Sequence, residues 1–151
     1  IMKKIMQLVM MAVVACFFAV GAGSVGQVEA AALYTPATYW NGNANYPVAF
    51  TQAGVNRYVD LSSAKVEEQT ENVEDNIKTA IFTYDVIMVN EQGVETSKFS
   101  YRTKIKFVGD EVFIFSARRN NDGWAQLSDR SFDQPQYNAA QILAEHFNIN
   151  K

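Results

Sequence analysis

The chain has 151 residues with 13 basic and 16 acidic side chains, so its formal net charge at pH 7 is −3. A negative net charge argues against a nucleic-acid-binding protein, because the phosphate backbone attracts a positive field. Cys16 is the only cysteine and His146 is the only histidine. Zinc and similar metals are usually held by several thiolates or imidazoles. We therefore expect no metal site, and we predict no cofactor.

The first 30 residues have the three regions of a secretory signal peptide. A lysine pair precedes residues 5–20, which carry no charged side chain, and a glycine-rich stretch of small residues follows. Val28 and Ala30 are small enough for the −3 and −1 positions of a cleavage site. We predict cleavage after Ala30 and a single secreted domain over residues 31–151, located in the periplasm or at the cell surface.

Two other features of this segment suggest different fates. The pattern Gly21-x-Gly23-x-x-Gly26 matches a dinucleotide-binding fingerprint, but the helix and the acidic residue that the fold requires do not follow it. Val13-Val14-Ala15-Cys16 resembles a bacterial lipobox, so a lipid anchor at Cys16 is our second interpretation. For a cleaved, mature protein, this anchor is the only membrane attachment that we consider. An uncleaved anchor ranks third, because about 20 apolar residues are needed to span a bilayer.

The first half of the predicted domain changes from loop to strand. Residues 31–45 are rich in Tyr, Asn and Ala without a helical period, so we expect them to be largely loop. Short strands are expected at 48–52 and 57–61, with a turn at Ala53-Gly54 between them. The polar segment 67–76 holds five carboxylates and one apolar side chain, and we predict that it is a solvated loop.

Two long strands are predicted next. Residues 77–89 are dense in β-branched and aromatic side chains on both faces, which is typical of a central strand. After a turn at 91–93, residues 98–107 alternate strictly between two kinds of side chain. This period of two places one set on each face of a half-buried strand. The apolar set is Phe99, Tyr101, Ile105 and Phe107, and the basic set is Lys98, Arg102, Lys104 and Lys106.

The turn after this strand decides what surrounds the basic side chains. Gly109-Asp110 fits a two-residue type II′ hairpin turn leading into a strand at 111–117. That turn would set Lys106 opposite Phe113 and Lys104 opposite Phe115, on a mixed aromatic and cationic face. A bulged turn would leave the face purely polar, and the sequence is compatible with both arrangements.

The C-terminal part predicts a last strand and a helix. A turn at 120–123 is followed by a short strand at 124–127. Apolar side chains then recur at helical spacing, and Asn138 is expected to cap a helix that runs to about Phe147. The helix must bury its apolar stripe against the sheet. We therefore predict an α+β fold, an antiparallel β-meander of about five to six strands or a half-barrel, closed by one C-terminal helix.

Short motifs in this pattern resemble the surface-adhesin protein E-like family of small exported domains in Gram-negative bacteria. Tyr58, Asp60 and Ser62 stand at the family's Tyr-x-Asp-x-Ser spacing, and residues 123–129 read "GWAQLSD" before the terminal helix. The resemblance covers about residues 55–147 and implies the fold, with binding of host matrix proteins in the best-known case. The predicted domain departs from many members because it has no cysteine.

Two surfaces are candidates for binding. The first is the row Lys98, Arg102, Lys104 and Lys106, whose spacing could match repeated anionic groups, although a row of lysines can also simply keep a sheet face solvated. The second comprises Tyr39, Trp40 and Tyr46 among asparagines and glycines. These aromatic side chains could stack on sugars or contact a protein, or they could cover the open end of the sheet core.

These observations favour a non-enzymatic binding or interaction domain of the bacterial cell envelope, possessing adhesin-like character by resemblance. Its expected partner is an envelope or host-surface macromolecule, of anionic character if the basic row binds it. An alternative is a structural periplasmic accessory that pairs through a sheet edge. A weaker alternative is a hydrolase that uses His146, but the predicted domain has no Gly-x-Ser-x-Gly motif.

Overall fold

The structure is a computed structural model and describes residues 37–117 and 123–149. The predicted signal peptide, with Cys16, and most of the predicted turn at 120–123 lie outside the described residues. The described residues belong to one compact unit, 36–151. Among the helices that the structure describes, none has the length and apolar character needed to cross a membrane.

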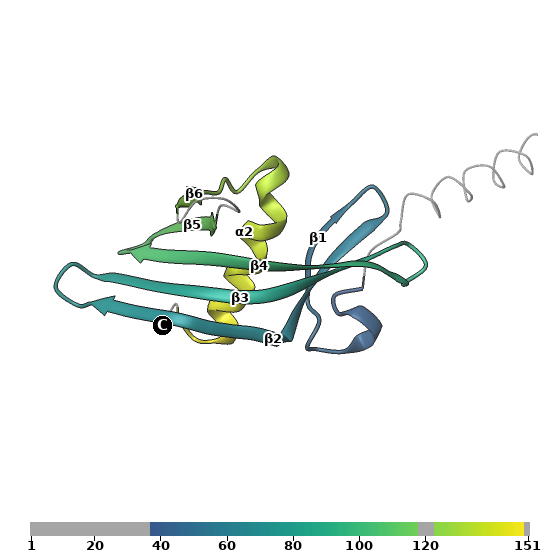
Figure 1. Cartoon of the computed structure of the whole chain (residues 1–151), viewed down its shortest axis with the longest axis horizontal. Helices are drawn as coiled ribbons and strands as arrows, with labels where there is room; N and C mark the ends of the chain where they lie inside the picture. Colours follow the sequence, from purple (N-terminus) through teal and green to yellow (C-terminus); the bar gives the residue numbers. More distant parts are fainter. Residues whose placement is uncertain (1–36, 118–122, 150–151) are drawn as a thin grey trace, which may run out of the picture. The chain divides into compact units, whose positions relative to one another are not determined.

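In the described part of the chain, one antiparallel sheet contains six strands in chain order, so each strand pairs with the next one along the chain (Figure 1). A short 3-10 helix, η1 (Trp40–Gly42), precedes the sheet. The strands are β1 (Val48–Gln52), β2 (Val55–Asn72), β3 (Ile77–Val89), β4 (Glu95–Val108), β5 (Glu111–Ala117) and β6 (Trp124–Gln126). The sheet is a curled half-barrel with one C-terminal helix, which confirms the predicted fold class.

The turn between β4 and β5 has two residues. Val108 pairs with Glu111, so only Gly109 and Asp110 lie outside the ladder. Gly109 has φ +58°, whereas Asp110 is not among the described residues with positive φ. This combination is that of a type II′ turn, whose first central position suits glycine because glycine has no Cβ to oppose a positive φ. Of the two arrangements that the sequence left open, the structure therefore has the mixed face.

The strand β2 is longer than predicted, and the prediction of a solvated loop at 67–76 is wrong. The strand continues to Asn72, and only residues 73–76 form the turn into β3. Glu68 pairs with Ile81, and Glu71 pairs with Lys78. The long apolar strand β3 offers backbone partners along its whole length, so the backbone of β2 is bonded while its carboxylates stay exposed. These charges also lie on a sheet edge, where they oppose pairing with another chain.

A bulge in β2 explains the local sequence Asp60-Leu61-Ser62-Ser63. Asp60 pairs with Asp85 and Lys65 with Thr83, so residues 61–64 face only one residue of β3. The Ser63 hydroxyl accepts a hydrogen bond from the Asp85 N–H at 2.9 Å and donates one to the Asp60 carbonyl at 2.7 Å. A side chain thus satisfies a backbone donor that the interrupted ladder leaves without its usual partner.

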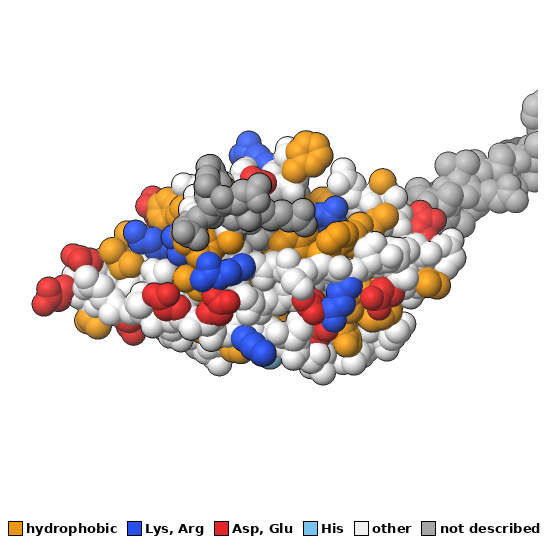
Figure 2. All heavy atoms as spheres, in the orientation of Figure 1, with side chains coloured by type: hydrophobic (Ala, Val, Ile, Leu, Met, Phe, Trp, Pro, Cys, Tyr) orange, Lys and Arg blue, Asp and Glu red, His pale blue; other side chains and the backbone are white. Residues whose placement is uncertain are grey.

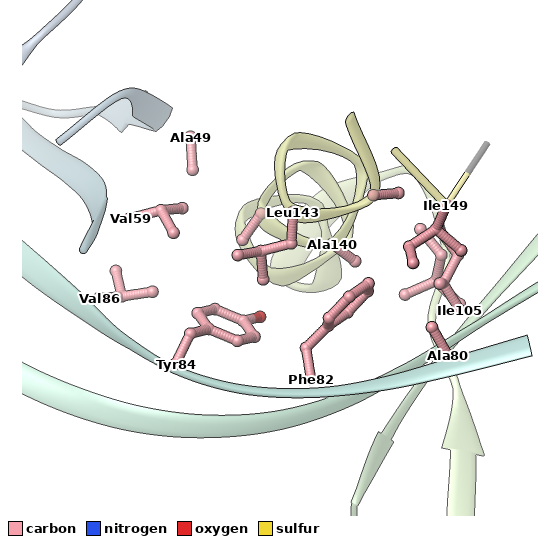
Figure 3. Packing of buried hydrophobic residues seen from close by; sticks show 13 residues of the cluster. Ala49, Val59, Ala80, Phe82, Tyr84, Val86, Ile105, Ala140, Leu143 and Ile149 are labelled. Atoms are coloured by element: carbon pink, nitrogen blue, oxygen red, sulfur yellow. The ribbon is translucent and has the colours of Figure 1, made fainter. Parts of the chain in front are cut away.

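The helix α2 (Gln134–His146) packs on the concave face of the sheet, which we call the inner face. Figure 3 shows Phe82 and Tyr84 projecting from β3 toward Leu143 and Ala140 of the helix. Phe82 and Leu143 are fully buried, and the Phe82 ring stacks on Phe147 with centroids 5.9 Å apart. Burial of this apolar stripe against the sheet holds the helix in place.

The helix begins earlier than predicted, and Asn138 is not its cap. The helix starts at Gln134, and Pro135 lies in its first turn. Proline is tolerated there because the first N–H groups of a helix have no partner within the helix. Asn138 lies inside the helix, where its side-chain amide donates to the Ala49 carbonyl at 2.8 Å and ties α2 to β1.

A buried polar chain links the helix to the sheet. The Tyr84 hydroxyl and the Thr103 Oγ1 are 3.1 Å apart, and the side-chain amide of Gln136 donates to the same Thr103 oxygen at 2.7 Å. Burial raises the pKa of Tyr84 above its ordinary value. These hydrogen bonds satisfy polar groups that would otherwise be costly in the core.

Candidate functional site

The predicted basic row lies on the face of the sheet turned away from α2, which we call the outer face. In Figure 1, β3 and β4 pass in front of α2, so Figure 2, in the same orientation, shows the face turned away from the helix. Basic, acidic and hydrophobic side chains are interspersed over it (Figure 2). The inner side of β4 carries the buried Thr103 and Ile105, which confirms the predicted alternation, although Phe99 on the same side is 44% exposed.

Lys98 is held in a polar network at one end of this face. Its Nζ lies 3.3 Å from Asp60 Oδ2 and 3.0 Å from Asp85 Oδ2. The Asp60 side chain is only 7% exposed and also accepts from the Ser62 N–H at 3.1 Å. A hydrogen bond from the Ser100 hydroxyl, together with Lys98, lowers the pKa of Asp85, while partial burial opposes this. The charge of Lys98 is therefore neutralised by carboxylates of the same domain.

Arg102 is also paired. Its Nε lies 2.7 Å from Glu67 Oε2, and its guanidinium carbon lies 5.0 Å from the centroid of the Trp124 ring. Glu67 belongs to the part of β2 that the sequence predicts to be loop, so this ion pair depends on the extended β2. Because both side chains are partly exposed, the pair fixes the position of Arg102 more than it stabilises the fold.

Lys104 lies over aromatic rings instead of beside a carboxylate. It pairs with Phe115 across the β4–β5 ladder. Its Nζ lies 4.7 Å from the Phe115 ring centroid and 4.8 Å from the Trp124 ring centroid. Burial and the nearby Lys106 lower the pKa of Lys104, and Glu68 partly opposes this. A cation over a ring face is attracted by the ring quadrupole but keeps its full charge.

Lys106 completes the aromatic part of the row. It lies opposite Phe113 on β5 and opposite Thr79 on β3. No ion pair between described residues includes Lys104 or Lys106. Thus the structure brings the four predicted cations to one face, but only the last two are without a carboxylate partner among the described residues. We call Lys104, Lys106, Phe113, Phe115 and Trp124 the cation–aromatic patch.

The second predicted surface is a separate cluster. Trp40 and Tyr46 meet edge to face with centroids 5.4 Å apart, and both pack against the buried Tyr58, Ile87 and Val89. The indole Nε1 of Trp40 donates to the Gly93 carbonyl at 3.0 Å. These two aromatic side chains therefore cover apolar residues of the sheet. Tyr39 is 41% exposed beside them.

The two surfaces do not join into one site. Ile81 lies opposite Lys104 on β3, whereas Ile87, on the same face, packs with Trp40 and Tyr46. From Ile81 to Ile87 the strand covers roughly 20 Å, at about 3.3 Å per residue.

His146 lies at the C-terminal end of α2 and is exposed, with its ring edge-on to Phe147 at 4.8 Å. The hydrogen bonds and ion pairs found between described residues do not join it to a serine or a carboxylate. Within 37–117 and 123–149, there is also no group of three or more His, Asp or Glu side chains that could hold a metal ion.

Trp124 and Glu67 are the site residues that the sequence did not identify. The sequence places Trp124 only in a short strand, and its position beside Arg102 and Lys104 follows from the pairing of Ala117 with Trp124. The position of Trp124 could have been predicted by counting residues across the β5–β6 hairpin, if the length of its turn were known. Glu67 required the correct length of β2.

Comparison of the chain with protein-family models, with curated proteins and with solved structures gives no match. The resemblance to the surface-adhesin protein E-like family therefore stays a prediction from short motifs, and the candidate site depends on its own geometry.

Proposed function

We propose that this chain is an exported, non-enzymatic binding domain of the bacterial cell envelope that acts through the cation–aromatic patch. The observation that supports this function is the pair Lys104 and Lys106, which lie on the outer face without a carboxylate partner among the described residues. Export is supported by the composition of the first 30 residues. The partner is an envelope or host-surface macromolecule that carries negative charge.

The patch combines attraction with contact area. Two ammonium groups steer an anionic partner toward the face. The half-buried rings of Phe113, Phe115 and Trp124 offer rigid apolar surface at little cost in side-chain entropy. The proposed patch binds its partner without catalysing a reaction, since binding requires neither a nucleophile nor a general base.

A capture experiment tests this function. The full chain, in the form that cells produce after export, is immobilised and exposed to envelope extract and to host matrix proteins at 50 mM and 500 mM salt. We expect a partner that is retained at low salt and released at high salt, because exposed charges are screened over about 10 Å at 0.1 M. Replacing both Lys104 and Lys106 by Gln should abolish capture.

Lys78→Gln is the matched control, since Lys78 lies on β3 with its side chain on the inner side, paired with Glu71 at 3.5 Å. Capture should survive this change, which removes the same kind of charge from the other face. A partner retained equally by the wild type and the double variant would place the interaction elsewhere, such as at the exposed edge of β2, and would overturn the proposal.

A further inference from the structure

We infer that the cation–aromatic patch binds phosphate monoesters carried on sugars, with the phosphate held by Lys104 and Lys106. This assignment rests on the proposed binding function and adds the chemical class of the ligand.

The spacing of the two lysines suits a single anionic group. Residues two apart on a strand are roughly 6.5–7 Å apart on one face, and both side chains are long enough to turn toward a group between them. A phosphate monoester carries about −1.5 to −2 charges at pH 7. Two ammonium groups without a carboxylate partner among the described residues match this dianion better than a singly charged carboxylate or sulfate ester.

Hydroxyl groups continue the row on the other side of Lys106. Thr79 lies directly opposite Lys106 on β3, and Thr70 lies opposite Thr79 on β2. Directly opposite residues have Cβ atoms about 4.5–5.5 Å apart, so the Thr79 hydroxyl is within reach of an oxygen bound at Lys106. Hydroxyls of this kind can donate to phosphate oxygens or exchange hydrogen bonds with sugar hydroxyls.

The aromatic side of the patch provides the contact for the sugar. Phe113 lies opposite Lys106 and is half-buried. Within the described part of the chain, the cations found over ring faces lie over Phe50, Phe115 and Trp124, and not over Phe113. The Phe113 ring can therefore receive the apolar face of a sugar while its phosphate lies between the lysines.

The surrounding charges disfavour an extended polyanion. Lys98 and Arg102, which would prolong the positive row, are already paired with Asp60, Asp85 and Glu67. Glu68 lies in the same cross-strand row as Lys104, separated from it by Ile81. A long sulfated chain would meet all of these carboxylates, whereas a single phosphate group held by Lys104 and Lys106 would lie near Glu68 but away from Asp60 and Asp85. The patch is therefore suited to discrete phosphate groups on a glycan.

An NMR titration of the exported chain tests this inference with three probes: glucose 6-phosphate, glucose 6-sulfate and glucose. We expect glucose 6-phosphate to shift the amide signals of Lys104, Lys106, Thr79 and Phe113, with a weaker effect of the sulfate and none of glucose. Binding of the phosphate should weaken several-fold between pH 7.5 and pH 5, because its second pKa is about 6. Sulfate ester binding should not change in this range.

Variants separate the role of the charge from that of the fold. Lys106→Gln should weaken phosphate binding about tenfold, because one charge-assisted hydrogen bond is lost. Lys106→Arg should retain most of the binding, and Lys78→Gln should leave it unchanged. Unfolding midpoints close to that of the wild type would show that each variant is folded.

Several results would overturn the inference and leave the proposed function standing. One is equal binding of phosphate and sulfate without a step near pH 6, which would indicate a general anion site. Another is capture of a macromolecular partner that depends on Lys104 and Lys106, with no shift caused by the sugar phosphate. Salt-sensitive self-association through the patch would likewise overturn it, because the ligand would then be a second copy of this chain and not a sugar phosphate. If neither the sugar phosphate nor any partner in the capture experiment bound to the patch, both the ligand class and the proposed binding function would be wrong.

Discussion

The two ends of the outer face of β4 carry lysines in opposite surroundings. Lys98 lies between the carboxylates of Asp60 and Asp85, whereas Lys104 lies over the rings of Phe115 and Trp124. Both lysines follow the same alternation along one strand. The comparison shows that alternation decides which face a cation occupies, while the neighbouring strands decide whether its charge is neutralised within the fold or remains available to a partner.

The largest effect is expected from removing the carboxylate that organises the polar end. Asp60→Ala should lower the free energy of unfolding by about 2–4 kcal/mol, because a buried hydrogen-bonded charge is lost and Lys98 and Ser62 lose a partner. Urea denaturation measures this change. Glu68→Ala removes an exposed carboxylate of the same strand and should cost at most about 0.5 kcal/mol. Equal costs would show that the polar end does not depend on Asp60.

A smaller effect is expected at the aromatic end. Lys104→Glu should destabilise the fold by about 1–2 kcal/mol, because a carboxylate over ring faces meets their negative side and the neighbouring Glu68. Lys106→Glu, two residues further on, should stay within about 0.5 kcal/mol. Thermal unfolding of the two variants compares them directly. If Lys106→Glu were the more damaging change, the ring contacts would not be what distinguishes these two lysines.

The smallest effect concerns pH at the polar end. The pKa of Asp85 is lowered by Ser100 and Lys98, so the folded state favours the carboxylate. Its contribution to stability is present above the ordinary pKa of 3.8 and is lost as the pH falls through the lower, folded-state value. Unfolding curves between pH 6 and pH 2.5 should show this loss, and Asp85→Asn should reduce the slope. An unchanged slope in the variant would assign the acid sensitivity to other carboxylates.

The sequence predicted most of the sheet because its strands carry strong local patterns. The apolar residues of β3 and the alternation in β4 predicted a central strand and a half-buried one, and the structure has both. The prediction was wrong where side-chain polarity was used to judge backbone pairing. Residues 67–72 are acidic and exposed, yet they form a strand because β3 is available as a partner.

The candidate site could be predicted only in part. The alternation placed Lys98, Arg102, Lys104 and Lys106 on one face. Whether Phe113 and Phe115 lie beside them depended on the turn at Gly109-Asp110, which the sequence left open and the structure shows to have two residues. Which cations are neutralised could not be predicted, because Asp60 and Asp85 reach Lys98 only through the register of β2, β3 and β4. That register depends on the bulge at residues 61–64.

By itself, the sequence determined the antiparallel meander, the terminal helix and the side of β4 on which the cations lie, since these follow from local periodicity and turn chemistry. The tertiary structure alone decided the length of β2, the start of α2 and the difference between Lys98 and Lys104. These features depend on partners distant in the chain, such as Glu67 for Arg102 and Trp124 for Lys104. Strand register, which no single segment encodes, brings such partners together.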